Sequence, residues 1–163
     1  MSPKNNNYEV KAGLAEVDTF DVVGVSIITD NQRGTNDINA LWEQFFKDQI
    51  GQAITNKTDD IIYAVYSDYE GDHEAPYRLT IGYRVTSNQT PSALHRVTVQ
   101  SQEYAVMSAA GVQPDALIET WKAIWSSTDL PRAYQTDFEA YGPRFFEDGV
   151  NEVLVHIGLN QSQ

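Results

Sequence analysis

The chain has 163 residues, the length of one domain and too short for a multidomain enzyme. Its 11 basic and 23 acidic residues give a formal net charge of −12, which repels a phosphate backbone, so we expect no direct nucleic-acid binding. The chain contains no cysteine, which excludes disulfides, thiolate nucleophiles and zinc-thiolate sites.

The first half of the chain predicts the order strand, helix, strand, strand. Residues 21–28 are apolar and rich in β-branched side chains, which predicts a buried strand. An amphipathic helix begins near residue 36, because apolar residues then recur every three or four positions. These residues are Ile38, Leu41, Trp42 and Phe45. The apolar runs 61–69 and 77–85 are joined by a short loop with Gly and Pro, which predicts a hairpin.

The second half repeats this order. Residues 103–109 have the pattern of a strand, and Pro114 is typical of the first position of a helix. An apolar stripe over residues 117–125 then predicts the helix itself. Two further strands are predicted at residues 137–141 and 151–159.

The two predicted helices align without gaps, and the alignment places Trp42 over Trp121. We interpret this as a duplicated βαββ unit. A sheet with one helix on one face cannot bury all its apolar surface alone, so two such units should join. We therefore predict an α+β fold with antiparallel sheets, two main helices and a central cleft between the halves.

The predicted boundaries follow from these elements. Residues 1–7 are polar and are expected to form a flexible N-terminus, and residues 160–163 a short tail. A single domain is expected over residues 8–159. Its two halves are expected at about residues 8–88 and 95–159.

Four short motifs carry a resemblance to a known family: residues 21–25, the helix with Trp121, the run 137–141 and the closing strand 152–157. Their order and spacing resemble the GyrI-like effector-binding family, which also forms the ligand-binding module of AraC-type and MerR-type multidrug-responsive transcription regulators. The resemblance implies two βαββ halves, a tandem SH2-like arrangement, and a cleft for lipophilic, often cationic, compounds. Because the module fills the chain, the protein is similar to stand-alone bacterial members, including drug-binding proteins carried on integron cassettes.

The resemblance also implies a set of ligand-binding residues. Glu139 corresponds to the acidic residue of the pocket, and Glu152 to an acid that opens the last strand. Tyr141 should share the face of Glu139, because side chains two apart on a strand point the same way. Three aromatic residues complete the expected set: Tyr66, Tyr104 and Trp121. Tyr66 and Tyr104 are preferred among the strand tyrosines, which also include Tyr63 and Tyr83.

Three of these residues have an ordinary structural alternative. Glu139 and Glu152 could face water, as most glutamates do. Trp121, on an apolar helical stripe, could pack in the core without touching a ligand. The sequence alone leaves these alternatives open.

The leading hypothesis is a protein that captures lipophilic cations, as a drug sensor or as the effector module of a transcription regulator. A carboxylate among aromatic side chains is partly desolvated, and a monovalent organic cation compensates its charge. Each aromatic face adds roughly 0.5 to 2 kcal/mol of cation-π attraction. We expect no cofactor and no metal.

Two other functions remain open. Glu139 could activate water in a hydrolase of reactive small molecules, although the chain lacks the common catalytic motifs. The acidic surface could instead bind a protein partner, such as DNA gyrase or a transcription regulator. The sequence shows no apolar signal segment and no membrane-spanning run, so we expect a cytoplasmic protein with no membrane partner.

Overall fold

The computed structural model describes residues 13–54, 57–72, 74–86, 90–126 and 130–160. The strands are β1 (Gly13–Val17), β2 (Phe20–Thr29), β3 (Lys57–Ser67), β4 (Tyr77–Val85), β5 (His95–Val99), β6 (Gln102–Ala109), β7 (Arg132–Tyr141) and β8 (Val153–Leu159). The helices are α1 (Gly34–Lys47), α2 (Ile50–Ala53), α3 (Asp115–Ser126) and the 3-10 turn η1 (Pro143–Phe146). The predicted N-terminal segment 1–7 lies outside the described residues.

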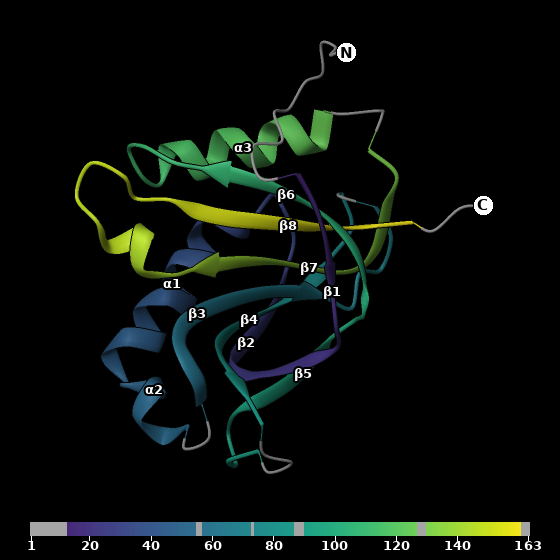
Figure 1. The fold of residues 1–163 in the computed structure, drawn as a ribbon. Coiled ribbons are helices and arrows are strands. Elements are labelled where there is room, and N and C mark those ends of the chain that lie inside the picture. The colour runs from purple at the N-terminus through teal and green to yellow at the C-terminus, as the bar shows by residue number, and fades with distance from the viewer. Residues whose placement is uncertain (1–12, 55–56, 73, 87–89, 127–129, 161–163) are drawn as a thin grey trace.

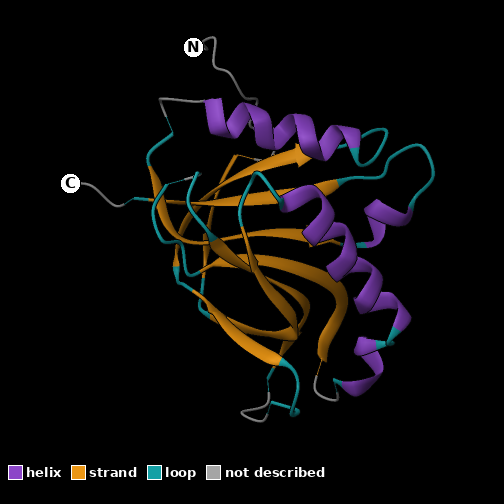
Figure 2. Ribbon diagram, turned by 180° about the vertical axis from the view of Figure 1, so that it is seen from behind, coloured by secondary structure: helices purple, strands orange, loops and turns teal. Residues whose placement is uncertain are grey.

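The strands form one antiparallel sheet in the order β1-β6-β8-β7-β3-β4-β2-β5 (Figure 1). The helices lie on one side of this curved sheet (Figure 2). The α+β class and the antiparallel pairing are therefore confirmed. The sequence patterns located six of the eight described strands and both long helices, but they missed the short edge strands β1 and β5.

The strand order is mirrored about the central β3–β7 pair. On one side, β2, α1, β3 and β4 follow each other along the chain, and on the other side β6, α3, β7 and β8 do so. α1 packs on β2 and β4, and α3 packs on β6. The two long helices thus cover different parts of the sheet, and the centre lies between them. Whether the halves are duplicated units stays a prediction.

The two edges of the sheet are joined by a bent ribbon. β1 pairs with β6 as far as Val17 opposite Gln102, and β2 pairs with β5 from Phe20 opposite Val99. Only two residues separate β1 from β2, and two separate β5 from β6, so the same register continues through the bend. This connection requires the sheet to curl back on itself.

The curl produces two apolar cores, one on each face of the sheet. The larger core fills the space between the sheet and the helices, and includes Leu41, Ile81 and Ile124. The second core fills the inside of the curl, and includes Phe20, Tyr63, Val99, Tyr104 and Phe138. Each central strand is therefore buried on both faces.

The backbones of β2 and β4 meet closely at two facing glycines, Gly24 and Gly82. A Cβ on Gly24 would lie 1.9 Å from the carbonyl oxygen of Ile81, and one on Gly82 would lie 1.9 Å from that of Val23. Backbone atoms within a sheet cannot move aside as a flexible side chain can. Both positions therefore require glycine.

We expect Gly82→Ala to lower the free energy of unfolding by about 2 kcal/mol or more, because the new methyl group displaces a central strand. Urea denaturation followed by circular dichroism measures this loss. Gly142→Ala is the matched control, since a Cβ there meets only Ile61 at 3.8 Å and φ is −94°. Equal stability of the two variants would contradict the expected clash.

Candidate ligand-binding site

A cavity of about 580 Å³ lies between α1 and α3, over β3 and β7, and is called here the central cavity. Its volume is in the range of cavities that hold drug-sized ligands. One wall is formed by Ile38, Trp42 and Phe46 of α1, and the opposite wall by Leu117, Trp121 and Trp125 of α3. From the sheet, the lining includes Tyr66 of β3 and Glu139 and Tyr141 of β7.

The helix walls follow from the apolar spacing of the sequence. Trp42 and Trp121, which align in the two predicted halves, face the cavity from opposite helices. Gln113 fixes the start of α3: its Oε1 accepts from the Leu117 N–H at 3.1 Å, and its Nε2 donates to the carbonyl oxygen of Ala109 at 2.9 Å. The first turn of α3 is therefore tied to the end of β6.

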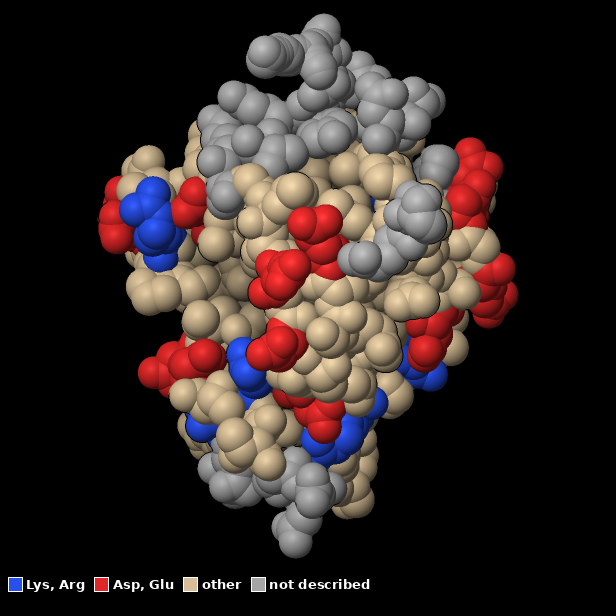
Figure 3. Space-filling view, turned by 45° about the vertical axis from the view of Figure 1, so that its right-hand side comes forward, with Lys and Arg blue, Asp and Glu red and all other residues tan. Residues whose placement is uncertain are grey.

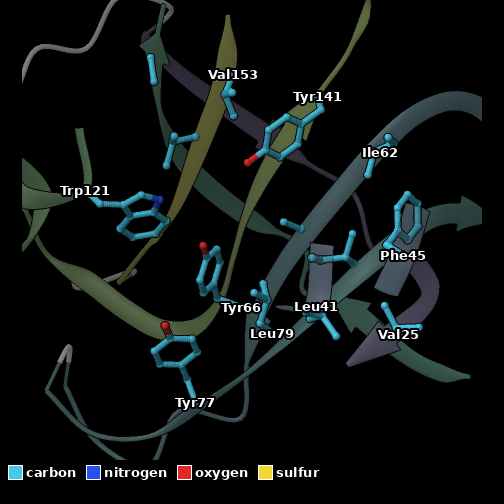
Figure 4. Packing of buried hydrophobic residues seen from close by; sticks show 14 of the residues in the cluster. Val25, Leu41, Phe45, Ile62, Tyr66, Tyr77, Leu79, Trp121, Tyr141 and Val153 are labelled. Atoms are coloured by element: carbon cyan, nitrogen blue, oxygen red, sulfur yellow. The ribbon is translucent and has the colours of Figure 1, made fainter. Parts of the chain in front are cut away.

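Glu139 is the only acid among the described residues that line the cavity, and 2% of its surface is exposed. Its Oε2 accepts hydrogen bonds from the Tyr66 hydroxyl and from the Trp121 indole N–H, both at 2.7 Å. Its Oε1 accepts from the Tyr141 hydroxyl at 2.6 Å. Figure 4 shows the polar tips of these three aromatic side chains pointing toward one another. Ala64 lies opposite Glu139 in the neighbouring strand, and its small side chain leaves room for the carboxylate.

Burial is the main influence on the pKa of Glu139. Desolvation raises the pKa of its carboxyl group, and the three hydrogen bonds offset part of that rise. No ion pair to Glu139 occurs among the described residues. Burial, and then the nearby Glu139 charge, raise the pKa of Tyr66 and Tyr141 well above the ordinary value, so both phenols stay protonated as donors.

Aromatic rings surround the carboxylate. The Tyr66 and Trp121 ring centroids are 5.0 Å apart, and those of Trp42 and Tyr141 are 4.9 Å apart. Tyr66 also contacts Tyr77, at 5.4 Å between centroids. Such rings present electron-rich faces that attract cations. The cavity thus combines apolar surface, aromatic faces and one buried negative group.

The structure brings together four of the six residues predicted for the site: Glu139, Tyr141, Tyr66 and Trp121. Glu139 does not face water, and Trp121 both packs in the core and lines the cavity.

Tyr104 and Glu152 lie elsewhere. Tyr104 belongs to the core on the opposite face of the sheet, where its hydroxyl donates to the Gln100 carbonyl oxygen at 2.7 Å. Glu152 is not part of the cavity lining, because its carboxylate accepts from Arg144 Nε at 2.6 Å and from the Ser108 hydroxyl.

The lining also includes residues that were not predicted for the site, among them Trp42, Tyr69, Tyr77 and Arg132. Trp42 could have been proposed from its alignment with Trp121. Tyr69 ends the predicted strand 61–69, but β3 stops at Ser67 and Asp68 has a positive φ of 53°, so strand alternation does not give the direction of Tyr69. The pairing of β7 with β8 is irregular between Arg132 and Asp137, so counting along the strand does not give the direction of Arg132.

Comparisons with known proteins agree with this geometry. The family model for integron-associated effector binding proteins, Cass2, matches residues 13–157. An integron cassette protein from the mobile metagenome of Vibrio cholerae is 28% identical, with a TM-score of 0.70 over 91% of this chain and 97% of that one. No curated protein sequence matches significantly.

Two more distant structures share the fold. SAV2435 bound to tetraphenylphosphonium is 15% identical, with a TM-score of 0.72 over 91% of this chain and 93% of that one. A putative bacterial transcription regulation protein from Staphylococcus aureus is 14% identical, with a TM-score of 0.67 over 93% and 99%. In the described part of this chain, no helix has the length and apolar character needed to cross a membrane.

The raised pKa of Glu139 predicts a cost in stability. Between the ordinary carboxyl pKa of 4.5 and the higher folded value, the folded protein keeps a proton that the unfolded chain has lost. The free energy of unfolding should therefore fall as pH rises through this interval, and the loss should persist at neutral pH. Glu139→Gln cannot ionise, so we expect it to be at least as stable as the wild type at pH 7.

Urea denaturation of both proteins between pH 4 and pH 8 measures this difference. The difference in free energy of unfolding between the variant and the wild type should become smaller as the pH falls toward the ordinary pKa of a carboxyl group. A variant that becomes progressively less stable than the wild type toward neutral pH would show that the ionised carboxylate is favoured by the fold.

Proposed function

Because this chain belongs to the integron-associated effector binding proteins, we propose that it captures lipophilic cationic small molecules in the central cavity. The observation that carries the proposal is the Glu139 carboxylate, which is buried among aromatic rings and has no ion-pair partner among the described residues. A monovalent organic cation supplies the missing charge. In this proposal Glu139, Tyr141, Tyr66 and Trp121 are the ligand-binding residues.

Three physical terms favour such a ligand. Apolar area removed from water contributes about 25 cal/mol per Å², and the aromatic faces add cation-π attraction. Two phenylalanines at the cavity, Phe46 and Phe146, are more than half exposed and offer apolar surface to an entering ligand. The net charge of −12 attracts cations over longer distances, and Figure 3 shows acidic side chains in several separate groups on the face in view, with fewer basic ones among them.

The similarly folded SAV2435 is described as bound to tetraphenylphosphonium, which is a lipophilic aromatic cation. This supports a ligand of the same chemistry here. The mirrored strand order likewise supports the proposal that two duplicated βαββ units meet at the cavity.

We extend the proposal to signalling. Another protein of this fold is described as a putative bacterial transcription regulation protein, which supports a role as a drug sensor or effector module. Since the chain is strongly acidic, its action on transcription would pass through a protein partner rather than through direct contact with DNA.

Tetraphenylphosphonium and tetraphenylborate have nearly the same shape and opposite charges, so they isolate the electrostatic part of binding. We expect the cation to bind the wild type and the anion to bind far more weakly. Glu139→Gln should lower the affinity for the cation about tenfold or more. It should also reduce the difference in affinity between the two ions. All three tryptophans of the chain line the cavity, so quenching of their fluorescence reports binding directly.

Glu152→Gln is the matched control, because it removes one negative charge outside the cavity lining. Its affinity for the cation should stay within about twofold of the wild type. Equal losses in the two variants would attribute binding to overall charge rather than to the buried carboxylate. Similar affinities of the wild type for the two ions would contradict selection for cations.

The hydrolase alternative depends on the same carboxylate, whose raised pKa suits a general base. Incubating the wild type and Glu139→Gln with activated aryl esters tests it. Turnover that is lost in the variant would favour a hydrolase. Capture of cations without turnover of these esters is the outcome that we expect.

A further inference from the structure

The central cavity contains a second buried ionic side chain, Arg132, for which the proposed function has no role. Arg132 begins β7, and its side chain is 5% exposed. Its Nη2 donates to Oδ2 of Asp137 at 2.8 Å. Trp121 donates to Glu139, and the Arg132 guanidinium lies 6.0 Å from the centre of the Trp121 ring. Arg132 and Glu139 are thus neighbours of the same indole, within reach of one ligand.

The Arg132 guanidinium is held in place but only partly hydrogen-bonded. Its carbon lies 4.3 Å from the centre of the Tyr134 ring and 5.9 Å from that of Tyr69. Its Nε and Nη1 are buried, and neither has an acceptor in the part of the chain that the structure describes. Folded proteins rarely leave buried donors without an acceptor, and each such donor is costly. Arg132 is therefore a residue of the cavity lining whose Nε and Nη1 have no acceptor among the described residues.

Asp137 does not supply the missing acceptors. Its Oδ1 accepts from the Gly158 N–H at 2.7 Å, and its Oδ2 already accepts from Arg132 and from the Tyr69 hydroxyl. Asp137 is fully buried, so it and Arg132 form an enclosed, electrically neutral pair. With Glu139 included, the three buried groups carry one net negative charge. A ligand with a single positive charge balances that total, whereas an added carboxylate would not.

We propose that Arg132 determines ligand specificity by donating hydrogen bonds to an uncharged carbonyl oxygen on the bound cation. The preferred ligand is therefore an aromatic monocation that carries an ester or amide group, rather than a plain cation or a zwitterion. This inference rests on the proposed function, because Glu139 receives the positive part of the same ligand.

Three dyes with one chromophore test the proposal. Tetramethylrhodamine methyl ester carries a carbonyl group, tetramethylrosamine lacks it, and the free acid tetramethylrhodamine is a zwitterion at neutral pH. Fluorescence anisotropy titrations measure their affinities for the intact chain. We expect the ester to bind the wild type about tenfold more tightly than the rosamine, and the free acid to bind no more tightly than the rosamine.

Arg132→Lys keeps the charge opposite Asp137 but loses the planar donors, so we expect the ester to lose its advantage while the rosamine affinity stays within about twofold. The double variant Arg132→Met, Asp137→Asn removes both charges of the neutral pair and should give the same result. Thermal melts identify which variants are folded. If Arg132→Lys does not fold, the double variant provides the same test.

The inference is overturned if ester and rosamine bind the wild type equally, if the ester keeps its advantage in every folded variant, or if the free acid binds most tightly. Binding of both dyes with equal affinity would leave the proposed function intact. If neither dye nor tetraphenylphosphonium binds, the proposed function fails and this inference fails with it.

Discussion

The site depends on the burial of one carboxylate without an ion-pair partner among the described residues. Removing an ionised carboxylate from water costs several kcal/mol, and three neutral donors around Glu139 recover part of that cost. The donors come from β3, α3 and β7, so they converge only when the whole sheet and α3 are assembled. The proposed affinity for a positive charge would therefore be a property of the tertiary fold rather than of one short motif.

The second core explains how the sheet can present polar groups at the bottom of a cavity. Phe138 alternates with Glu139 along β7, and Val65 with Tyr66 along β3, so Glu139 and Tyr66 each have an apolar neighbour that faces the inside of the curl. Phe138 contacts Phe20, with ring centroids 5.5 Å apart. The second core packs against one face of these strands and fixes their position. On the other face, α1 and α3 are separated by the central cavity, which leaves space for a ligand.

Local sequence patterns predicted much of the fold, and the expected effector-binding family is confirmed. The edge strands β1 and β5 were missed because each is short and pairs with a distant segment. The spacing of two residues correctly placed Glu139 and Tyr141 on one face. It could not choose among the four strand tyrosines Tyr63, Tyr66, Tyr83 and Tyr104, since only the register of the assembled sheet decides which face each strand turns to the helices. Glu152 is held by Arg144, a contact that no spacing rule anticipates.

The bent ribbon has a consequence for how the chain reaches this state. β1 precedes the first strand–helix–strand–strand unit but pairs with β6 of the second, and β5 precedes the second unit but pairs with β2 of the first. The strand that precedes each half thus pairs with the other half, as in a domain swap between subunits. A half taken alone would therefore lack one strand of its sheet. Closing the ribbon brings together segments more than 70 positions apart in the chain, which is typical of slow folding.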